Sequence, residues 1–427
     1  MDKLRITSIA SLLLIFLALR FFFFYQNQPH YTDGQYVNFE TTLFSEPKIF
    51  GNYQTLSANL GTSNKILIKT NLYPKFHYQD TVSISGYIHE QTLNVPGKIK
   101  FKVLENKRTL TMIYFPKIEA VKKDKNLLLS LTSFVRQNVI LLFSKTLPEP
   151  SSSLLLGIVF GIKESMPKDF ENNLRTSGVL HVVAASGMNI SMIGAFASSI
   201  FAFFFKRQAA LVASILIIIF YAFLAGLEPS ILRAAIMGVL AFSGQILGKQ
   251  NLAFYGLFIA AYSMLFYSPM LLLDVGFQLS FLATLGLLYI KPIFNRGQRF
   301  GLMLRKLALG DDIVTTFSAQ ISTLPVLLIN FGFYSLWSIL VNVLILWTIP
   351  FLMVIGGIGA ILGFFIEPLG KLILYLALPF LLYFELIVSL FAGWGAVVNF
   401  EDIPWQMIVA YYCILLSVIL FFQKRNR

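Results

Sequence analysis

Long apolar runs constrain this chain more than any other feature of its sequence. Stretches of about 20 almost entirely apolar residues recur between residues 178 and 422, and a helix needs roughly that many to cross the hydrocarbon core of a bilayer. Hydrophobic residues make up 56% of the 427 residues and charged residues 13%, a composition that soluble globular proteins do not have. The sequence therefore predicts a polytopic α-helical membrane protein.

About ten transmembrane helices are expected. Residues 1–25 have a basic start and an apolar body without a small-residue cleavage site, which predicts an uncleaved membrane anchor. The region 178–427 contains the other spans, at 178–205, 208–226, 230–247, 251–267, 270–290, 312–330, 335–366, 371–396 and 404–422. The range 335–366 is long for one crossing and contains Pro350, so a broken helix or a hairpin stays open there.

Residues 26–126 are different in character. Apolar and polar residues alternate in KILIKTNLY (65–73) and TVSISGYIHE (81–90), and a period of two is typical of strands. We expect a small extracytoplasmic all-β domain with an OB-like barrel. Its mildly basic surface is compatible with an ordinary solvated face or with a nucleic-acid face. Residues 127–177 mix amphipathic pieces with a short apolar run. We expect them to lie on the outer face of the membrane that the helices span.

Cations predict the orientation. The net charge of +13 does not by itself indicate nucleic acid, because membrane proteins collect Lys and Arg in cytoplasmic loops. If the spans alternate, Lys206, Arg207, Lys249 and the basic loop 291–306 fall on one side. The sequence therefore predicts a bacterial cytoplasmic membrane protein with its N-terminus inside, its β domain outside and its C-terminus inside.

Polar residues within the apolar spans are costly in lipid and indicate a protein-lined or hydrated interior. They occur in four segments, HVVAASGMN, GLEPSILRA, DVGFQLS and SAQISTLP. We expect these segments to converge on one hydrated pathway, with Arg233 and Asp274 as partners and with Asp274 and Gln278 on one face in the middle of a span. Interhelical hydrogen bonds that only hold the bundle together are the alternative. The candidates from these segments are His181, Ser186, Gly187, Asn189, Glu228, Ser230, Arg233, Asp274, Gln278 and Gln320.

Four segments in order also resemble motifs of one known family. The string SLLLGIVFGIKESMPKDFENNLRTSGVLHVVAASGMNISMIG is similar to the signature of the ComEC family, the membrane channel for single-stranded DNA in natural transformation. YAFLAGLEPSILRAAIMG, SPMLLLDVGFQLSFLATLG and SAQISTLPVLLINFGFYSLWSILVN resemble its later motifs, so that the resemblance covers residues 151–342. It implies a translocation path that includes His181, Ser186, Gly187, Arg233, Asp274, Gly276, Gln278 and Gln320.

The sequence departs from many members of that family in one respect. They carry a metallo-β-lactamase-like domain, whereas the histidines here are His30, His77, His89 and His181, without a His-x-His-x-Asp-His set. No Walker motif is present either. We therefore expect no metal, no cofactor and no enzymatic activity. The partners implied are single-stranded DNA, membrane lipid, a DNA receptor and pilus components outside, and a helicase or strand-loading protein inside; GAILG (359–363) leaves a homo-oligomer open.

Two other functions are compatible with parts of this sequence. A transporter or flippase for another anionic or amphipathic envelope polymer has the same sequence requirements as a DNA channel. An intramembrane serine protease is the more remote alternative, because AASG ends at Ser186 and Gly187. In a continuous helix, however, His181 lies roughly 140° around the axis from Ser186, which is too far for it to take the hydroxyl proton.

Overall fold

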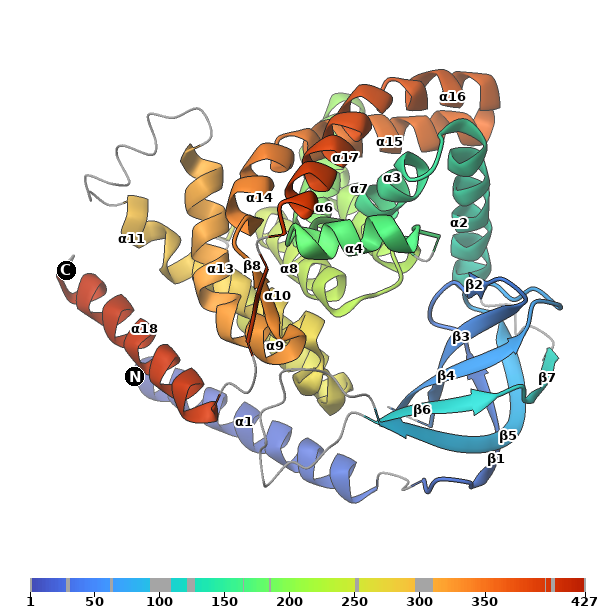
Figure 1. The fold of residues 1–427 in the computed structure, drawn as a ribbon. Helices are drawn as coiled ribbons and strands as arrows, with labels where there is room; N and C mark the ends of the chain where they lie inside the picture. Colours follow the sequence, from blue (N-terminus) through green and yellow to red (C-terminus); the bar gives the residue numbers. More distant parts are fainter. Residues whose placement is uncertain are drawn as a thin grey trace.

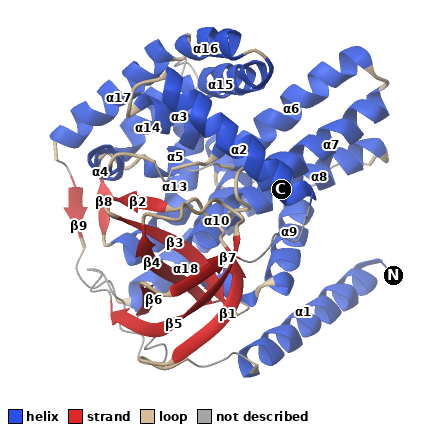
Figure 2. Cartoon of the chain, turned by 90° about the vertical axis from the view of Figure 1, so that its right-hand side faces the viewer, coloured by secondary structure: helices blue, strands red, loops and turns tan. Residues whose placement is uncertain are grey.

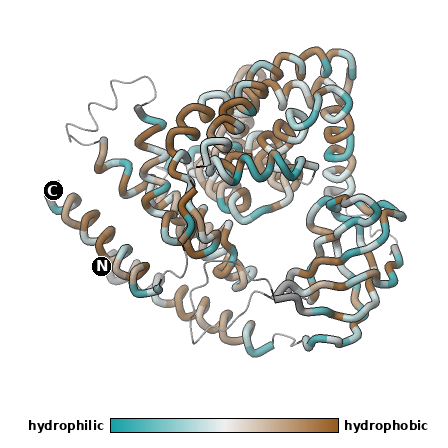
Figure 3. The backbone as a smooth tube through the Cα atoms, in the orientation of Figure 1, coloured by the Kyte–Doolittle hydropathy of each residue, from teal (hydrophilic) through white to brown (hydrophobic). Residues whose placement is uncertain are grey.

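The computed structural model describes residues 2–27, 31–61, 64–92, 109–120, 127–163, 165–183, 186–249, 253–295, 310–395, 397–400 and 404–425. These residues form a β-rich domain near the N-terminus and a larger body of helices (Figures 1 and 2). The helices are predominantly apolar, whereas polar and apolar residues alternate in the β-rich domain (Figure 3). The expected class, a polytopic helical membrane protein with an N-terminal β domain, is confirmed.

The β-rich domain is a closed five-stranded barrel with two short additions. The sheet order is β1-β5-β6-β4-β3-β2, and β4 pairs with β6 in parallel. A backbone hydrogen bond from Phe44 N to Ser57 O (3.3 Å) and the packing of β1 against β3 close the barrel. This order with one parallel pair is that of an OB-like fold. The strands are β1 (Tyr36–Thr42), β2 (Lys48–Phe50), β3 (Tyr53–Leu60), β4 (Asn64–Asn71), β5 (Thr81–Thr92), β6 (Thr109–Tyr114) and β7 (Lys117–Ala120).

Alternation along the strands explains the barrel. In β3 and β5 every second residue is buried, as expected when one face of a strand points inward. Leu56, Ile68, Ile84, Ile88 and Ile113 are all fully buried in the barrel core.

The helical body begins with α2 (Leu127–Thr146), which leads from the barrel to α15 and α16 (Figure 1). The helices of the body are α3 (Ser151–Phe160), α4 (Lys168–Thr176), α5 (Leu180–Val183), α6 (Gly187–Phe204), α7 (Arg207–Leu224), α8 (Pro229–Ile246), α9 (Ala253–Tyr267), α10 (Val275–Tyr289), α11 (Lys291–Asn295), α13 (Gly310–Phe331), α14 (Ser338–Leu346), α15 (Thr348–Phe365), α16 (Glu367–Tyr375) and α17 (Leu378–Gly393). A 3-10 helix, η1 (Pro269–Leu273), precedes α10, and β8 (Phe333–Ser335) pairs with β9 (Val397–Asn399). Two long helices, α1 (Asp2–Gln26) and α18 (Trp405–Arg425), lie outside this body (Figure 1).

Seven helices among the described residues are long and apolar enough to cross a membrane, or eight if the bent pair of α16 and α17 is one span. Apolar helices also form at the two remaining expected spans, 1–25 and 251–267, but their apolar lengths, Ser11–Gln26 and Ala253–Tyr267, are shorter. Within 335–366 the chain forms α14 and α15 with a break at Trp347, so the broken-helix alternative is the one observed.

Two segments differ from what the sequence suggested. All residues of α3 are buried in the protein core, whereas an interfacial position was expected for this run; its apolar residues are covered by α2, α15 and α17 instead of by lipid. The range 270–290 is not a continuous span, because η1 ends and α10 begins at Asp274. Asp274 therefore lies at the end of a helix and not in the middle of one.

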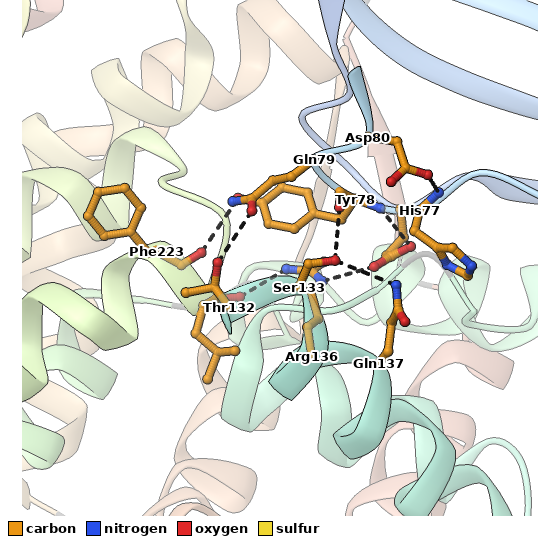
Figure 4. Close-up of polar contacts among 11 residues, drawn as sticks. His77, Tyr78, Gln79, Asp80, Thr132, Ser133, Arg136, Gln137 and Phe223 are labelled. Carbon is orange, nitrogen blue, oxygen red and sulfur yellow. Dashed lines mark hydrogen bonds and ion pairs between the residues drawn. The ribbon is translucent and has the colours of Figure 1, made fainter. Parts of the chain in front are cut away.

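The buried cation Arg136 of α2 connects the barrel to the helical body (Figure 4). Arg136 is 3% exposed. Its Nε lies 3.5 Å from Oε1 of Glu46, and its Nη1 donates to the Leu224 carbonyl at the end of α7 (3.0 Å). The guanidinium also lies 4.6 Å from the ring centroid of Tyr78, and the Tyr78 N–H donates to Oε2 of Glu46. One side chain thus joins two barrel loops to α2 and α7.

The close contact of α10 with α13 depends on Gly286. A Cβ at this position would overlap the side chain of Ser322 and the carbonyl oxygen of Ser318. We expect Gly286→Ala to destabilise the protein by about 1–3 kcal/mol, because the two helices must separate. Thermal unfolding of the purified protein in nanodiscs measures this loss of stability. Gly357→Ala is the matched control, since no atom lies within 4 Å of that Cβ position, and equal stability losses in both variants would contradict the explanation.

Candidate functional site

A cavity of about 1430 Å³ lies inside the helical body, larger than the roughly 300–1,000 Å³ of an ordinary small-molecule pocket. Residues of α6, α8, α10 and α13 form most of its wall, and residues of α4, α5, α9, β8 and α14 together with Lys48 of the barrel also contribute. Along α8 the wall extends from Ser230 to Gln245, a rise of about 22 Å. Along α13 it extends from Thr315 to Phe331, a rise of about 24 Å.

The cavity brings together eight of the eleven candidate residues from all four polar segments. They are His181, Ser186, Gly187, Glu228, Ser230, Arg233, Gly276 and Gln320. The expected convergence of the four segments is therefore observed, while the role of these residues in translocation stays a prediction.

Arg233 provides a buried positive charge in the cavity wall. The residue is 9% exposed, and its Nε and Nη1 donate to the hydroxyl oxygens of Ser280 and Thr284, each at 2.6 Å. Among the residues that the structure describes, no carboxylate lies within ion-pair distance of it. Because a guanidinium stays protonated, the wall carries a charge held by neutral groups.

The predicted ion pair between Arg233 and Asp274 is therefore wrong. Asp274 instead caps α10, where its Oδ1 accepts a hydrogen bond from the Phe277 N–H (3.1 Å). Ser280, which binds Arg233, lies six residues further along the helix, a rise of about 9 Å. The break between η1 and α10 produces this result, because a helix end needs an acceptor for its free N–H groups.

The second guanidinium edge of Arg233 faces the start of α6. A Cβ on Gly187 would lie 2.9 Å from Nη2, so only glycine leaves this edge uncovered. Ser186, Gly187 and Arg233 all contribute to the cavity wall. The first residues of α6 line the cavity as well, and the N-terminus of a helix carries partial positive charge. The electrostatics of this wall favour an anion.

Cations also lie where the cavity meets the barrel and α4. Lys163 pairs with Glu228 (3.0 Å), and Arg175 pairs with Glu171 (3.5 Å). All four side chains are partly exposed and line the cavity. These pairs place partly exposed charges of both signs at this end, in contrast to the buried Arg233.

Neutral polar groups line the side formed by α13, β8 and α14. Tyr334 donates through its hydroxyl to Gln320 Oε1 (2.8 Å), and Gln320 Nε2 donates to Ser338 Oγ (3.2 Å). Ser338 in turn donates to the Tyr334 hydroxyl (3.2 Å). The sequence indicated Gln320 but not Tyr334 or Ser338, because these two come from a short strand and a helix start that apolar periodicity does not reveal.

Two other candidates have local structural roles outside the cavity wall. Asn189 is 3% exposed and donates to the Ile158 carbonyl (2.7 Å), while its Oδ1 accepts from Ser186 Oγ (3.1 Å). It therefore ties α6 to α3. Gln278 donates to the Leu272 carbonyl (2.8 Å) and closes the turn between η1 and α10. Neither residue lines the cavity.

The helical body matches the sequence model of a known protein family. A sequence model described as Competence protein matches residues 158–425. ComE operon protein 3 of Bacillus subtilis (strain 168) is 25% identical over 232 residues, which cover 53% of this chain and 28% of that protein. The uncharacterized protein YcaI of Escherichia coli (strain K12) is 30% identical over 110 residues, 23% of this chain and 15% of that protein. The matches thus cover under a third of each relative, and no solved structure matches.

Proposed function

Because this chain belongs to the competence protein family, we propose that it forms the channel through which single-stranded DNA crosses the bacterial cytoplasmic membrane during natural transformation. The observation that carries the proposal is the length of the cavity, whose wall includes polar groups from all four segments. Its walls on α8 and α13 rise about 22–24 Å, most of a hydrocarbon core about 30 Å thick.

The chemistry of the wall suits a single strand. Each nucleotide carries one phosphate charge, and its base presents an apolar face. Arg233 and the N-terminus of α6 provide few, fixed positive sites for phosphates, while Gln320, Tyr334 and Ser338 provide neutral hydrogen-bonding groups. Conduction requires binding that is weak and repeated, and a wall rich in lysine would hold a polyanion too tightly.

The proposed orientation places the barrel outside and the N-terminus in the cytoplasm. The N-terminus lies on the side of the molecule away from the β domain (Figure 2), as this orientation requires. A DNA receptor and pilus components would deliver the strand outside, and a helicase or strand-loading protein would receive it inside. We assign the energy supply for transport and the degradation of the complementary strand to such partners.

Deletion of the gene tests the proposal. Deletion cells should bind labelled DNA at their surface but should not accumulate a labelled strand in the cytoplasm, and a plasmid copy should restore uptake. Normal uptake by the deletion strain would overturn the proposed function. Normal uptake together with a defect in an envelope polymer would instead favour export of that polymer.

A further inference from the structure

The cavity ends near α11, on the side of the helical body away from the barrel (Figure 1), and we name this its inner end. On α10, Ser280, Thr284 and Leu287 line the cavity. Residues three or four apart lie on one face of a helix. The apolar span Val275–Phe294 continues beyond α10, so Lys291, four residues after Leu287, extends the same face by one turn.

The helix α13 brings a second row of cavity-lining residues to the same end. Thr323, Ala319 and Thr315 line the cavity and follow one another at intervals of four residues. Asp311 lies one turn beyond Thr315, in the first turn of α13. Because α10 and α13 pack against each other, the two rows meet where α13 begins.

Lys291 and Asp311 form an ion pair at this meeting point. The Lys291 Nζ lies 3.0 Å from Asp311 Oδ2 and donates to Thr315 Oγ1 (2.7 Å). The side chain of Lys291 is 25% exposed, whereas that of Asp311 is 69% exposed. The amine is therefore held beside a residue of the cavity wall, while its carboxylate partner faces outward. Exposed ion pairs contribute little to stability, so another anion can displace this carboxylate.

The partner of Lys291 differs in charge from the partners of Arg233. The neutral hydroxyls of Ser280 and Thr284 hold Arg233 and do not compete with an anion, whereas the carboxylate of Asp311 does compete for Lys291. Lys291 follows Thr284 by seven residues on one helix face, a rise of about 10 Å. An anion that moves along this face therefore passes from a cation without a competing carboxylate to a cation with one.

We propose that Lys291 and Thr315 form a second binding site for phosphodiester groups, at the inner end of the cavity. A strand that arrives from Arg233 displaces the carboxylate of Asp311, and the returning carboxylate releases the strand. This inference rests on the proposed function, in which the basic loop that starts at Lys291 is cytoplasmic. Conduction requires sites that bind weakly enough for the passenger to leave, and Asp311 provides that weakness at the last site.

Cross-linking in transforming cells tests the site. In a Cys413→Ser background, Leu287→Cys places a thiol one turn from Lys291, and DNA with thiol-reactive groups on its backbone reports the occupancy of the inner end. Asp311→Asn should increase the cross-linked fraction about two- to fivefold, the range of an exposed ion pair, and should slow uptake. Lys291→Gln should lower that fraction. Asp312→Asn is the matched control, because it removes the same charge from a residue that is not a partner of Lys291, and it should change neither value.

The opposite signs of the two effects distinguish a binding site from a structural ion pair. A cross-linked fraction that falls in both Asp311→Asn and Lys291→Gln would overturn the proposal, because a pair that only joins two helices loses the same contact in either variant. Equal effects of Asp311→Asn and Asp312→Asn would also overturn it, since they would indicate a general effect of charge. If Leu287→Cys does not reach the membrane, Ala283→Cys replaces it one turn earlier on the same face.

Purified protein in nanodiscs distinguishes a strand from a lipid headgroup, which also carries a phosphodiester. Asp311→Asn should accelerate the reaction of Leu287→Cys with a thiol-reactive oligodeoxythymidine in phosphatidylcholine, and to the same extent after phosphatidylglycerol is added. An acceleration that phosphatidylglycerol abolishes would show that lipid occupies the site and would overturn the proposal. The nanodisc result is separable from the deletion experiment. Normal DNA uptake by deletion cells would remove the channel and leave this site standing, whereas loss of uptake together with no effect of Asp311→Asn would remove the site alone.

Discussion

Cells carrying Arg233→Gln are expected to take up labelled DNA about 10- to 100-fold more slowly than wild-type cells. This range corresponds to the roughly 1.5–3 kcal/mol of a hydrogen bond to a charged group. Arg233 is the buried cation of the cavity wall, with two nitrogens held by Ser280 and Thr284. The third nitrogen lies beside Gly187, and it is the one that we expect a phosphate to contact. Glutamine removes the charge and keeps a polar side chain.

Two further variants separate the charge of Arg233 from its geometry. Arg233→Lys keeps the charge but loses the planar fork, so its uptake should fall between those of the wild type and Arg233→Gln. Arg175→Gln removes a cation that is 48% exposed and paired with Glu171, and it should change uptake by less than about fivefold. Uptake at the wild-type rate by Arg233→Gln cells, with normal amounts of protein in the membrane, would contradict the assigned role.

Replacing Arg136 with methionine is expected to destabilise the attachment of the barrel by about 3–5 kcal/mol. This is the typical loss when one member of a buried ion pair is removed. Glu46, 9% exposed, would then lose its ion pair, and the Leu224 carbonyl would lose its donor. Thermal unfolding and limited proteolysis of the protein in nanodiscs measure the loss.

The companion variants test whether the ion pair is the cause. Arg136→Met combined with Glu46→Gln should be less destabilised than Arg136→Met, because no unpaired buried charge remains. Lys371→Met breaks the more exposed pair with Glu367 and should cost at most about 1 kcal/mol. Equal losses for Arg136→Met and Lys371→Met would show that burial of the pair has no special effect.

The sequence predicted the class of the protein and the convergence of its polar segments for one physical reason. Lipid penalises polar groups, so those in apolar helices, such as Arg233 and Gln320, are confined to protein-lined interiors. The same penalty does not distinguish a polar group that lines an opening from one that only forms a hydrogen bond with a neighbouring segment. Asn189 and Gln278 bond to backbone carbonyls instead, and hydropathy cannot distinguish these cases.

The errors in the site arise where helices break. Asp274 looked like the middle of a span because η1 and α10 are both apolar, yet the chain turns between them. Ser280 and Thr284 therefore hold Arg233 where Asp274 was expected to. Within the barrel, Tyr36, Tyr87 and Tyr114 become neighbours only through strand register, which the sequence alone does not reveal.

Cross-linking during uptake tests the central claim, that the cavity is the route of the strand, most directly. Cys413 is the single cysteine of the chain, so a Cys413→Ser background permits one reporter at a time. Ser280→Cys places a thiol in the cavity wall, and Ser389→Cys places one on the exposed surface of α17, outside that wall. Transforming DNA with thiol-reactive groups on its backbone should cross-link to Ser280→Cys and not to Ser389→Cys. Cross-linking of neither or of both to the same extent, in cells that take up DNA, would contradict the account.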